Sequence, residues 1–204
     1  MLVRSDALSV GAFRDYWHGK HADIVRQMPH LHRYVQNHIL RKIGADVGEP
    51  AFQVDGIPEL WFRDEEAKAA AFQSHAAKAL PADEKNFIKG ITIFAVEETV
   101  LRPGDGAAKV LLLARGAAGQ LCEKLSRTLP GLKRCVCNRI LSSEHRPGVW
   151  HEPSPPDLIV ELRFDSEGDA EAALASDAYQ SLGASAVHRG AAIAVYLVDE
   201  RTIV

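Results

Sequence analysis

The sequence predicts an α+β protein built from two tandem copies of one β-α-β-β-α-β unit, and two observations support this. Residues 28–40 return as residues 129–141, with Pro, Leu, Arg, Val, Asn, Ile and Leu at matching positions. The same order of strand-like and helix-like segments also occurs on both sides of a Gly/Pro hinge at residues 102–106. Positions that the copies share should describe a common scaffold, and positions that differ should show where a site was kept in one copy.

In the first half, apolar side chains after Ser9 recur every three or four residues as far as Met28, which predicts one helix that Pro29 ends. Alternating residues over 33–40 then predict a strand. The remaining elements are a short first strand, another strand, a helix that ends at Pro81 and a last strand, at residues 2–4, 57–62, 64–81 and 91–96.

The second half repeats this order, with elements expected at residues 109–115, 117–128, 134–141, 158–164, 168–182 and 193–199. We therefore expect two domains, at residues 1–102 and 108–204. The order is that of the ferredoxin-like fold, an antiparallel sheet with both helices on one face. Two such sheets can pack through their bare faces and close an intramolecular α/β barrel around a central cavity.

The composition is that of a globular protein, with 47% hydrophobic and 25% charged residues among 204. Because the net charge is -3 and the basic residues are dispersed, nucleic acid and anionic membranes are not expected as partners. No apolar run approaches the ~20 residues of a membrane helix, and no signal peptide is recognisable, which favours a cytoplasmic location. Three cysteines, Cys122, Cys135 and Cys137, then favour reduced thiols.

The repeat also indicates which face of each strand looks into the cavity. Leu60 and Phe62 recur as Leu162 and Phe164, as expected of positions that pack on helices in both halves. Positions that diverge between the copies are expected on the other face. The residues placed on the cavity side by this argument, with Glu59 included although it recurs as Glu161, are Tyr34, Gln36, His38, Glu59 and Trp61.

The segments 16–25, 33–38 and 56–62, together with the ending Val96-Glu97-Glu98-Thr99, resemble the EthD family of dimeric α/β barrel proteins. The resemblance covers residues 1–100, and its most specific part is the Trp-x-x-x-His helix followed by a Tyr-Val-Gln-Asn-His strand. It implies a ferredoxin-like fold, a barrel made from two sheets, and a role in degrading or tailoring small organic molecules. Relatives on this fold include lactone isomerases, polyketide cyclases or dehydratases, and cofactor-free monooxygenases.

Two departures from the family pattern matter. The second half resembles the family only in its strand and its ending, and its helix has no equivalent of Trp17 or His21, so a site carried by the helix exists once. The first strand, at residues 2–4, is short for the family. Either the true start lies upstream or the first sheet has a weak edge.

The leading catalytic candidate, on the family resemblance, is His21, because an imidazole that is partly buried can act as general acid or base near neutral pH. The alternative is a structural histidine that fixes the helix to the sheet. His38 is a candidate for a second proton-transfer group or an orienting donor, or it is a polar residue near a rim.

A planar substrate could be held by the aromatic side chains of Trp17, Tyr34 and Trp61, with Gln36 beside them and Glu59 positioned to bind a hydroxyl or orient a histidine. For Trp17, ordinary helix packing is the better explanation, because its spacing to Phe13 and Ile24 is that of a helix face. Nine histidines include the pairs His18/His21 and His30/His32, but neither pair has a specific metal-ligand spacing, so no metal is predicted. The loop over residues 142–156 either covers one barrel mouth or is a surface connection.

Phosphate-binding glycine loops and nucleophile elbows are absent from the sequence, which argues against a nucleotide cofactor and hydrolase chemistry. The sequence and the resemblance together lead us to expect a cofactor-free proton-transfer enzyme, such as an isomerase, dehydratase or cyclase, acting on a small cyclic or aromatic carbonyl or lactone. One alternative is a non-catalytic protein that binds a small hydrophobic or aromatic metabolite in the same cavity, and another is a cofactor-free monooxygenase. A homodimer is left open.

Overall fold

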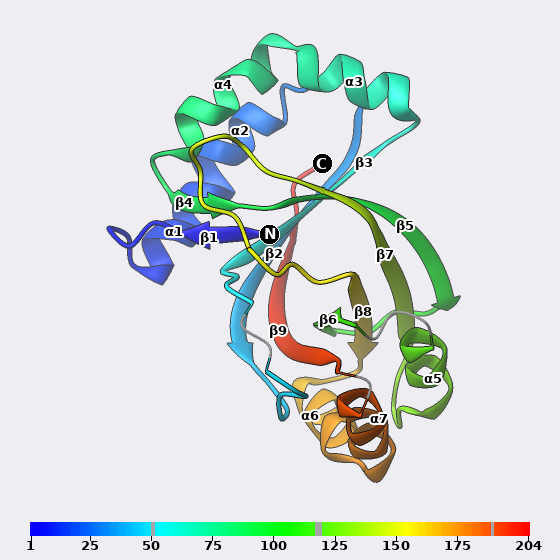
Figure 1. The fold of residues 1–204 in the computed structure, drawn as a ribbon. Helices are drawn as coiled ribbons and strands as arrows, with labels where there is room; N and C mark the ends of the chain where they lie inside the picture. Colours follow the sequence, from blue (N-terminus) through cyan, green and yellow to red (C-terminus); the bar gives the residue numbers. More distant parts are fainter. Residues whose placement is uncertain (50–51, 117–119, 189) are drawn as a thin grey trace.

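A computed structural model describes residues 1–204 except 50–51, 117–119 and 189 (Figure 1). Its strands are β1 Leu2–Arg4, β2 Leu31–Lys42, β3 Gly56–Phe62, β4 Ile88–Ile91, β5 Ile93–Arg102, β6 Ala108–Arg115, β7 Arg134–Glu144, β8 Leu158–Phe164 and β9 Ala192–Thr202. Its helices are α1 Val10–Tyr16, the π-helix η1 Trp17–His21, α2 Ala22–Val25, α3 Glu65–Gln73, α4 His75–Glu84, α5 Leu121–Thr128, α6 Glu167–Ala175 and α7 Asp177–Val187. The predicted α+β class is confirmed.

One antiparallel sheet contains all of these strands, in the order β4-β1-β3-β2-β9-β6-β8-β7-β5. The last strand of each half pairs with strands of the other half: β5 lies beside β7, and β9 lies between β2 and β6. The sheet therefore runs through both halves without interruption. The division into domains at 1–102 and 108–204 stays a prediction.

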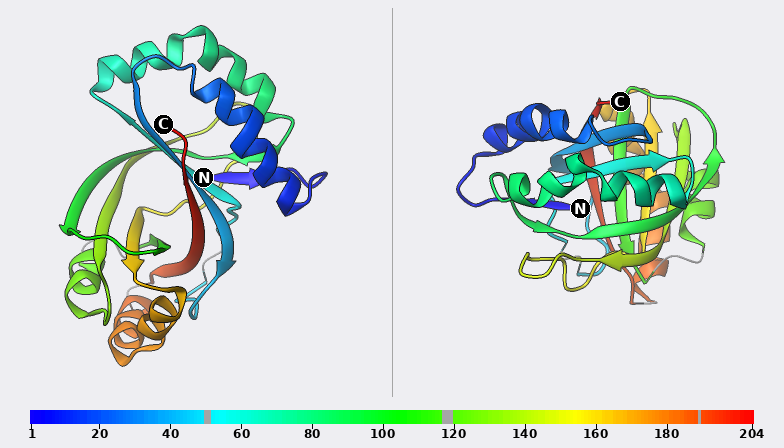
Figure 2. Two further views of the ribbon diagram at one scale, coloured as in Figure 1. Left: turned by 180° about the vertical axis from the view of Figure 1, so that it is seen from behind. Right: turned by 90° about the horizontal axis from the view of Figure 1, so that it is seen from above.

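The helices form two layers at opposite ends of the molecule, with the strands between them (Figure 2). In the first layer, α2, α3 and α4 bury Val25, Ala71 and Leu80 against Leu60 and Phe62 of β3. In the second layer, the helices pack on a larger apolar cluster that includes Leu112, Leu125, Leu162 and Phe164. The prediction that Leu60, Phe62, Leu162 and Phe164 face helices is thus confirmed.

The other face of the sheet, which we call the inner face, carries apolar side chains from both halves. Its buried members are Met1, Phe52, Ile57, Leu111, Leu113, Ile159, Ala194, Tyr196 and Val198. The two ends of the strand order, β4 and β5, are joined in the chain by Thr92 alone. A closed barrel in which β4 continues into β5 would have this strand order. The barrel and its central cavity stay a prediction.

The first predicted helix is present but is not a uniform α-helix. Ser9 is its N-cap, and the Ser9 hydroxyl accepts a hydrogen bond from the Ala12 N–H at 3.1 Å. The segment Trp17–His21 then widens into a π-helix before α2 completes the run. Such wider turns are frequent at functional sites, so this interruption directs attention to Trp17 and His21.

The second predicted helix differs from the expectation, because Pro81 does not end it. The chain breaks earlier, at Ser74, whose hydroxyl accepts from the Ala77 N–H and caps α4. Helix α4 then continues through Pro81 to Glu84. The expectation that a proline stops this helix is wrong, and the extra turn carries an acidic residue, Asp83, into the helix layer.

In the second half, the predicted helix over 168–182 is two helices, α6 and α7, separated at Ser176, which caps α7. The predicted helix start at Ala117 lies outside the described residues. The expectation of reduced thiols is wrong for two of the cysteines, since Cys122 and Cys137 form a disulfide with a Cα–Cα distance of 6.0 Å. They meet because α5 packs on the helix-facing side of β7, whereas Cys135 is buried and free.

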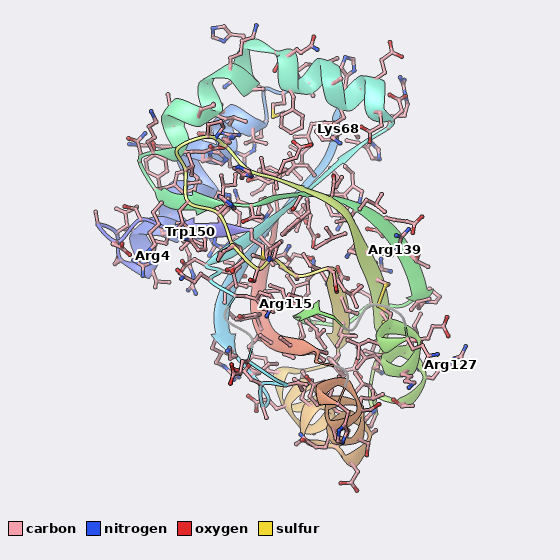
Figure 3. The ribbon with its side chains drawn as sticks, viewed as in Figure 1. Arg4, Lys68, Arg115, Arg127, Arg139 and Trp150 are labelled. Carbon is pink, nitrogen blue, oxygen red and sulfur yellow. A yellow bond between two sulfur atoms is a disulfide. The ribbon has the colours of Figure 1, made fainter. Side chains whose placement is uncertain are left out.

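The 142–156 loop lies against the first half of the chain. The Ile91 N–H donates to the Trp150 carbonyl at 2.9 Å, and Trp150 packs directly on Gly90. Arg146 forms an ion pair with Glu84 of α4. Figure 3 places the labelled Trp150 beside the elements that begin the chain. The loop therefore connects the second half to the helix layer of the first.

None of the helices in the described part of the chain is long and apolar enough to span a membrane.

Candidate functional site

The sheet separates the seven predicted site residues into two groups. Those on the helix side are Trp17, His21, Tyr34, Gln36 and His38, and those on the inner face are Glu59 and Trp61. The prediction that Tyr34, Gln36 and His38 face a cavity is wrong. Tyr34 lies opposite Leu60 in the register of β2 and β3, and paired residues share a face, so this side of β2 packs on the helices.

A hydrogen-bond network joins four of these residues between η1 and β2. The Trp17 indole Nε1 donates to the Tyr34 hydroxyl at 3.0 Å. The Gln36 amide Nε2 donates to the same hydroxyl at 2.9 Å and to the Trp17 carbonyl at 2.8 Å. Trp17 also requires a glycine at position 56, because a Cβ there would lie 2.3 Å from its ring. Trp17 therefore packs between the first helix and the sheet, and its contact with a substrate stays a prediction.

His38 is the fourth member of this network and is fully buried. Its Nε2 lies 3.1 Å from Gln36 Oε1, and its ring lies 4.4 Å from the Trp17 ring. Burial, assisted by the charge of Arg201, lowers the pKa of His38 to about 3. The imidazole is thus neutral, with Nδ1 left without a partner among the described residues.

His21 points away from this network, toward α4. Trp17 packs on the sheet, where its ring meets Gly56 and His38. His21 places its Nδ1 2.8 Å from Asp83 Oδ2 and its ring 4.8 Å from that of Phe87. The His21 Nε2 has no hydrogen-bond partner in the described part of the chain.

Two further side chains hold Asp83 in place. The Tyr16 hydroxyl donates to Asp83 Oδ1 at 2.8 Å, and the Asn86 amide donates to the Tyr16 hydroxyl at 3.1 Å. Burial and the hydrogen bond to Asp83 raise the pKa of Tyr16, so its hydroxyl remains protonated at neutral pH. Both Asp83 carboxylate oxygens are thereby engaged, one with Tyr16 and one with His21.

The protonation state of His21 results from opposing effects. Burial lowers its pKa, and this outweighs Asp83, which raises it; the charge of Arg146 adds to the lowering. The ring is therefore neutral at pH 7, its Nδ1–H donates to Asp83, and the lone pair of Nε2 can accept a proton. An imidazole oriented by a carboxylate in this way is suited to general acid–base chemistry.

Asp83 is the residue of the candidate site that sequence reasoning missed. The helix was expected to end at Pro81, which left Asp83 in a loop with no defined neighbour. The signal available in the sequence was the acidic pair Asp83-Glu84 shortly after a helix rich in alanine. An extension of that helix would have brought a carboxylate beside the first helix and its histidine.

Charged side chains gather on the inner face around Lys109. The Lys109 Nζ lies 2.6 Å from Glu200, 3.0 Å from Glu161 and 3.4 Å from Glu59, and only 2% of the Lys109 side chain is exposed. Arg163 contacts Glu161 at 2.8 Å and Glu200 at 2.6 Å. Burial raises the pKa of Glu59, whereas Lys109 and Arg163 overcome burial and lower the pKa of Glu161 to about 2.

An open pocket of about 490 Å³ lies beside this cluster and is lined by Leu40, Lys109, Arg163, Val198 and Glu200, among others. Its volume is within the range of small-ligand sites. The remaining predicted binding residue, Trp61, lies under the Arg33 guanidinium at 4.6 Å from the ring centroid. Trp61 therefore contacts a cation of its own strand pair.

The described residues contain no group of three or more histidine, cysteine, aspartate or glutamate side chains placed to hold a metal ion.

Residues 5–90 match the family model of the EthD domain. No curated protein matches the chain.

Two solved structures resemble the whole chain. One is described as an anthrone oxidase-like protein, with a TM-score of 0.55, 12% identity, and 99% of this chain and 90% of that chain covered. The other is a putative monooxygenase from Lactobacillus acidophilus NCFM, with a TM-score of 0.47, 11% identity, and 94% and 90% covered. At 12% identity, the similarity to the anthrone oxidase-like protein supports the fold alone. The similarity to the monooxygenase has a TM-score below 0.5 and supports no conclusion.

Proposed function

We propose that this protein is an enzyme that moves a proton on a small organic carbonyl compound, with His21 as the acid–base group. The observation that carries the proposal is the His21–Asp83 pair on the π-helix, with Nε2 free to receive a proton. The EthD domain supports an enzyme or binding protein for small molecules. The cyclic or aromatic carbonyl or lactone class remains our proposal for the substrate.

In the proposed reaction, His21 Nε2 removes a proton from the carbon next to a carbonyl group. The C–H electron pair moves into the carbonyl to form an enolate, and the imidazole becomes an imidazolium stabilised by Asp83. The imidazolium then returns the proton to another carbon, which completes an isomerisation, or to a departing hydroxyl, which completes a dehydration. Tyr16 keeps Asp83 oriented throughout.

His38 has a different role in this proposal from that of His21. Because it is fully buried and its pKa is low, it is better suited to hold Gln36 and Trp17 than to exchange protons with a substrate. Glu59 lies on the opposite face of the sheet from His21, bound to Lys109, and so takes no part in this step. The proposal therefore rests on one histidine.

Exchange of substrate protons with deuterium tests the proposal without knowledge of the product. A panel of cyclic and aromatic ketones and lactones is incubated with the protein in deuterium oxide and followed by proton NMR. We expect exchange next to the carbonyl of at least one compound, a loss of about 10²–10⁴-fold in His21→Ala, and a smaller loss in Asp83→Asn. His75→Ala, an exposed histidine on α4, is the matched control.

The same experiment separates the alternatives. Full exchange by His21→Ala would refute the role of His21. Compounds that bind, as shown by shifted ligand resonances, but never exchange would instead support the non-catalytic binding protein. Consumption of dissolved oxygen with a bound compound would support the monooxygenase alternative.

A further inference from the structure

The 142–156 loop of the second half carries an arginine, Arg146, to the helix layer of the first half. The loop leaves β7, which pairs with β5, and passes beside α4 (Figure 1). Arg146 forms an ion pair with Glu84, the last residue of α4. The residue before Glu84 is Asp83, the hydrogen-bond partner of His21. Arg146 and His21 therefore contact the same end of α4.

The backbone beside Arg146 forms a tight turn that holds this side chain in place. The turn has the sequence Arg-Pro-Gly-Val, and the Val149 N–H donates to the Arg146 carbonyl at 3.1 Å. Gly148 has a φ of 75°, which agrees with a type II turn, where proline precedes a glycine of positive φ. Val149 then packs on the apolar cluster that contains Phe87. Because the His21 ring also contacts Phe87, the turn and the imidazole are fixed on the same cluster.

The guanidinium of Arg146 has hydrogen-bond donors left for a ligand. Its Nη1 donates to Glu84, and within the described part of the chain the guanidinium makes no second hydrogen bond. An arginine carries five N–H groups in one plane, so most of them remain available. The Arg146 side chain is 23% exposed, which makes these groups accessible from solvent. The pair with Glu84 therefore orients Arg146 without using all of its donors.

The charge of Arg146 acts on the imidazole of His21. It lowers the pKa of His21, as a cation near a titrating base does. The same charge that disfavours an imidazolium favours an anion held beside it. A neutral base next to a fixed cation is suited to removing a proton from a ligand whose negative charge develops on an oxygen atom.

We propose that the His21 site takes enolisable ketones and phenols, and that Arg146 binds the oxygen of the enolate or phenolate that forms there. His21 Nε2 takes the proton from the C–H or O–H group of the ligand. The electron pair of the broken bond comes to rest on the ligand oxygen, which accepts hydrogen bonds from the Arg146 guanidinium. This inference rests on the proposed role of His21, and it adds a substrate class and a residue of the second half.

Binding of 4-nitrophenol tests the arginine site directly, because the ionised form of this probe absorbs at a longer wavelength than the neutral form. The probe is titrated with the full chain at a pH where both forms are present. We expect saturable binding with a shift toward the phenolate, and phenolate binding at least about tenfold weaker in Arg146→Gln. Arg139→Gln, which removes an exposed arginine of β7 and changes the net charge equally, is the matched control and should bind as the wild type does.

A second pair of variants separates ligand binding from a purely structural ion pair. Glu84→Gln breaks the same ion pair but keeps the Arg146 charge, so the phenolate should bind at least as tightly as to the wild type. Arg146→Lys also keeps the charge and should retain part of the binding. Equal weakening by Arg146→Gln and Glu84→Gln would show that the pair only fastens the loop to α4, and would refute the proposal. The absence of saturable binding of the phenol would refute it as well.

Deuterium exchange distinguishes a failure of this inference from a failure of the proposed function. Arg146→Gln should slow the exchange that depends on His21 by about 10²–10³-fold, the loss that follows removal of one donor to a developing oxyanion. Exchange that requires His21 but is unchanged in Arg146→Gln would refute the role of Arg146 and leave the proposed function standing. If no compound exchanges, yet phenolate binding depends on Arg146, the proposed function fails and the arginine site stands.

Discussion

The helix layers of the two halves cover corresponding strands, β2 and β7, whose helix-facing side chains differ in chemical type. In the first half, the helix side of β2 presents Tyr34, Gln36 and His38, which form a polar network with Trp17. The matching positions of β7 are Cys135, Cys137 and Arg139. There, a buried thiol and a disulfide to Cys122 replace the network. The first layer holds ionisable groups in specific orientations, and the second is apolar and covalently cross-linked.

This difference fits our proposal, in which the helix layer of the first half carries the chemistry and that of the second half supports the fold. A buried polar network is costly unless all its members are hydrogen-bonded, so its presence in one copy alone points to a role beyond packing. The His21–Asp83 pair beside it has no counterpart on α5. Substitutions in the two layers can therefore be compared by their effects on the free energy of unfolding.

The largest expected effect on stability comes from Trp17→Ala. Trp17 is fully buried, packs on Gly56 and donates to Tyr34, so its removal should lower the free energy of unfolding by about 3–5 kcal/mol. Leu125→Ala, at a fully buried position in the second layer, is the apolar comparison and should cost about 2–5 kcal/mol. Urea unfolding measures both. A loss below about 1 kcal/mol for Trp17→Ala would show that the network is not anchored by this residue.

A smaller effect is expected from the disulfide of the second layer. Its cysteines are 15 residues apart in sequence, so reduction should lower the free energy of unfolding by about 3 kcal/mol. Unfolding with and without reductant measures this difference. Cys137→Ala should abolish the effect of reductant, whereas Cys135→Ala should preserve it. Equal stability of the oxidised and reduced wild-type protein would contradict the assignment of a stabilising cross-link to this layer.

Much of the fold could be predicted because it depends on local patterns. Apolar spacing after Ser9 located the first helix, and alternation located β2, β3 and β8. The failures arose where tertiary contacts overrode a local rule. The helix breaks at Ser74 instead, and α4 continues through Pro81 to Glu84. The disulfide depends on α5 packing against β7, which cysteine counting does not reveal.

The candidate site was harder to predict, for a physical reason. Divergence between the copies marks residues expected to face the cavity, and it assigned Trp61 to the inner face, where the structure places it. Glu59 was placed on that face although it recurs as Glu161, and it also lies there. On β2 the divergent residues instead face the helices, because the helix layers themselves differ. Asp83 was missed because its position depends on how α4 packs beside η1.

The most direct test of the central claim is the pKa of His21, measured by NMR on the wild-type protein and on Asp83→Asn with labelled histidine. In the wild-type protein, burial should hold the pKa below its usual value. Asp83→Asn removes the carboxylate that favours the imidazolium, so the pKa should fall further. A pKa that is the same in both proteins would show that Asp83 does not orient His21, and would contradict the account of the first helix layer as the site of chemistry.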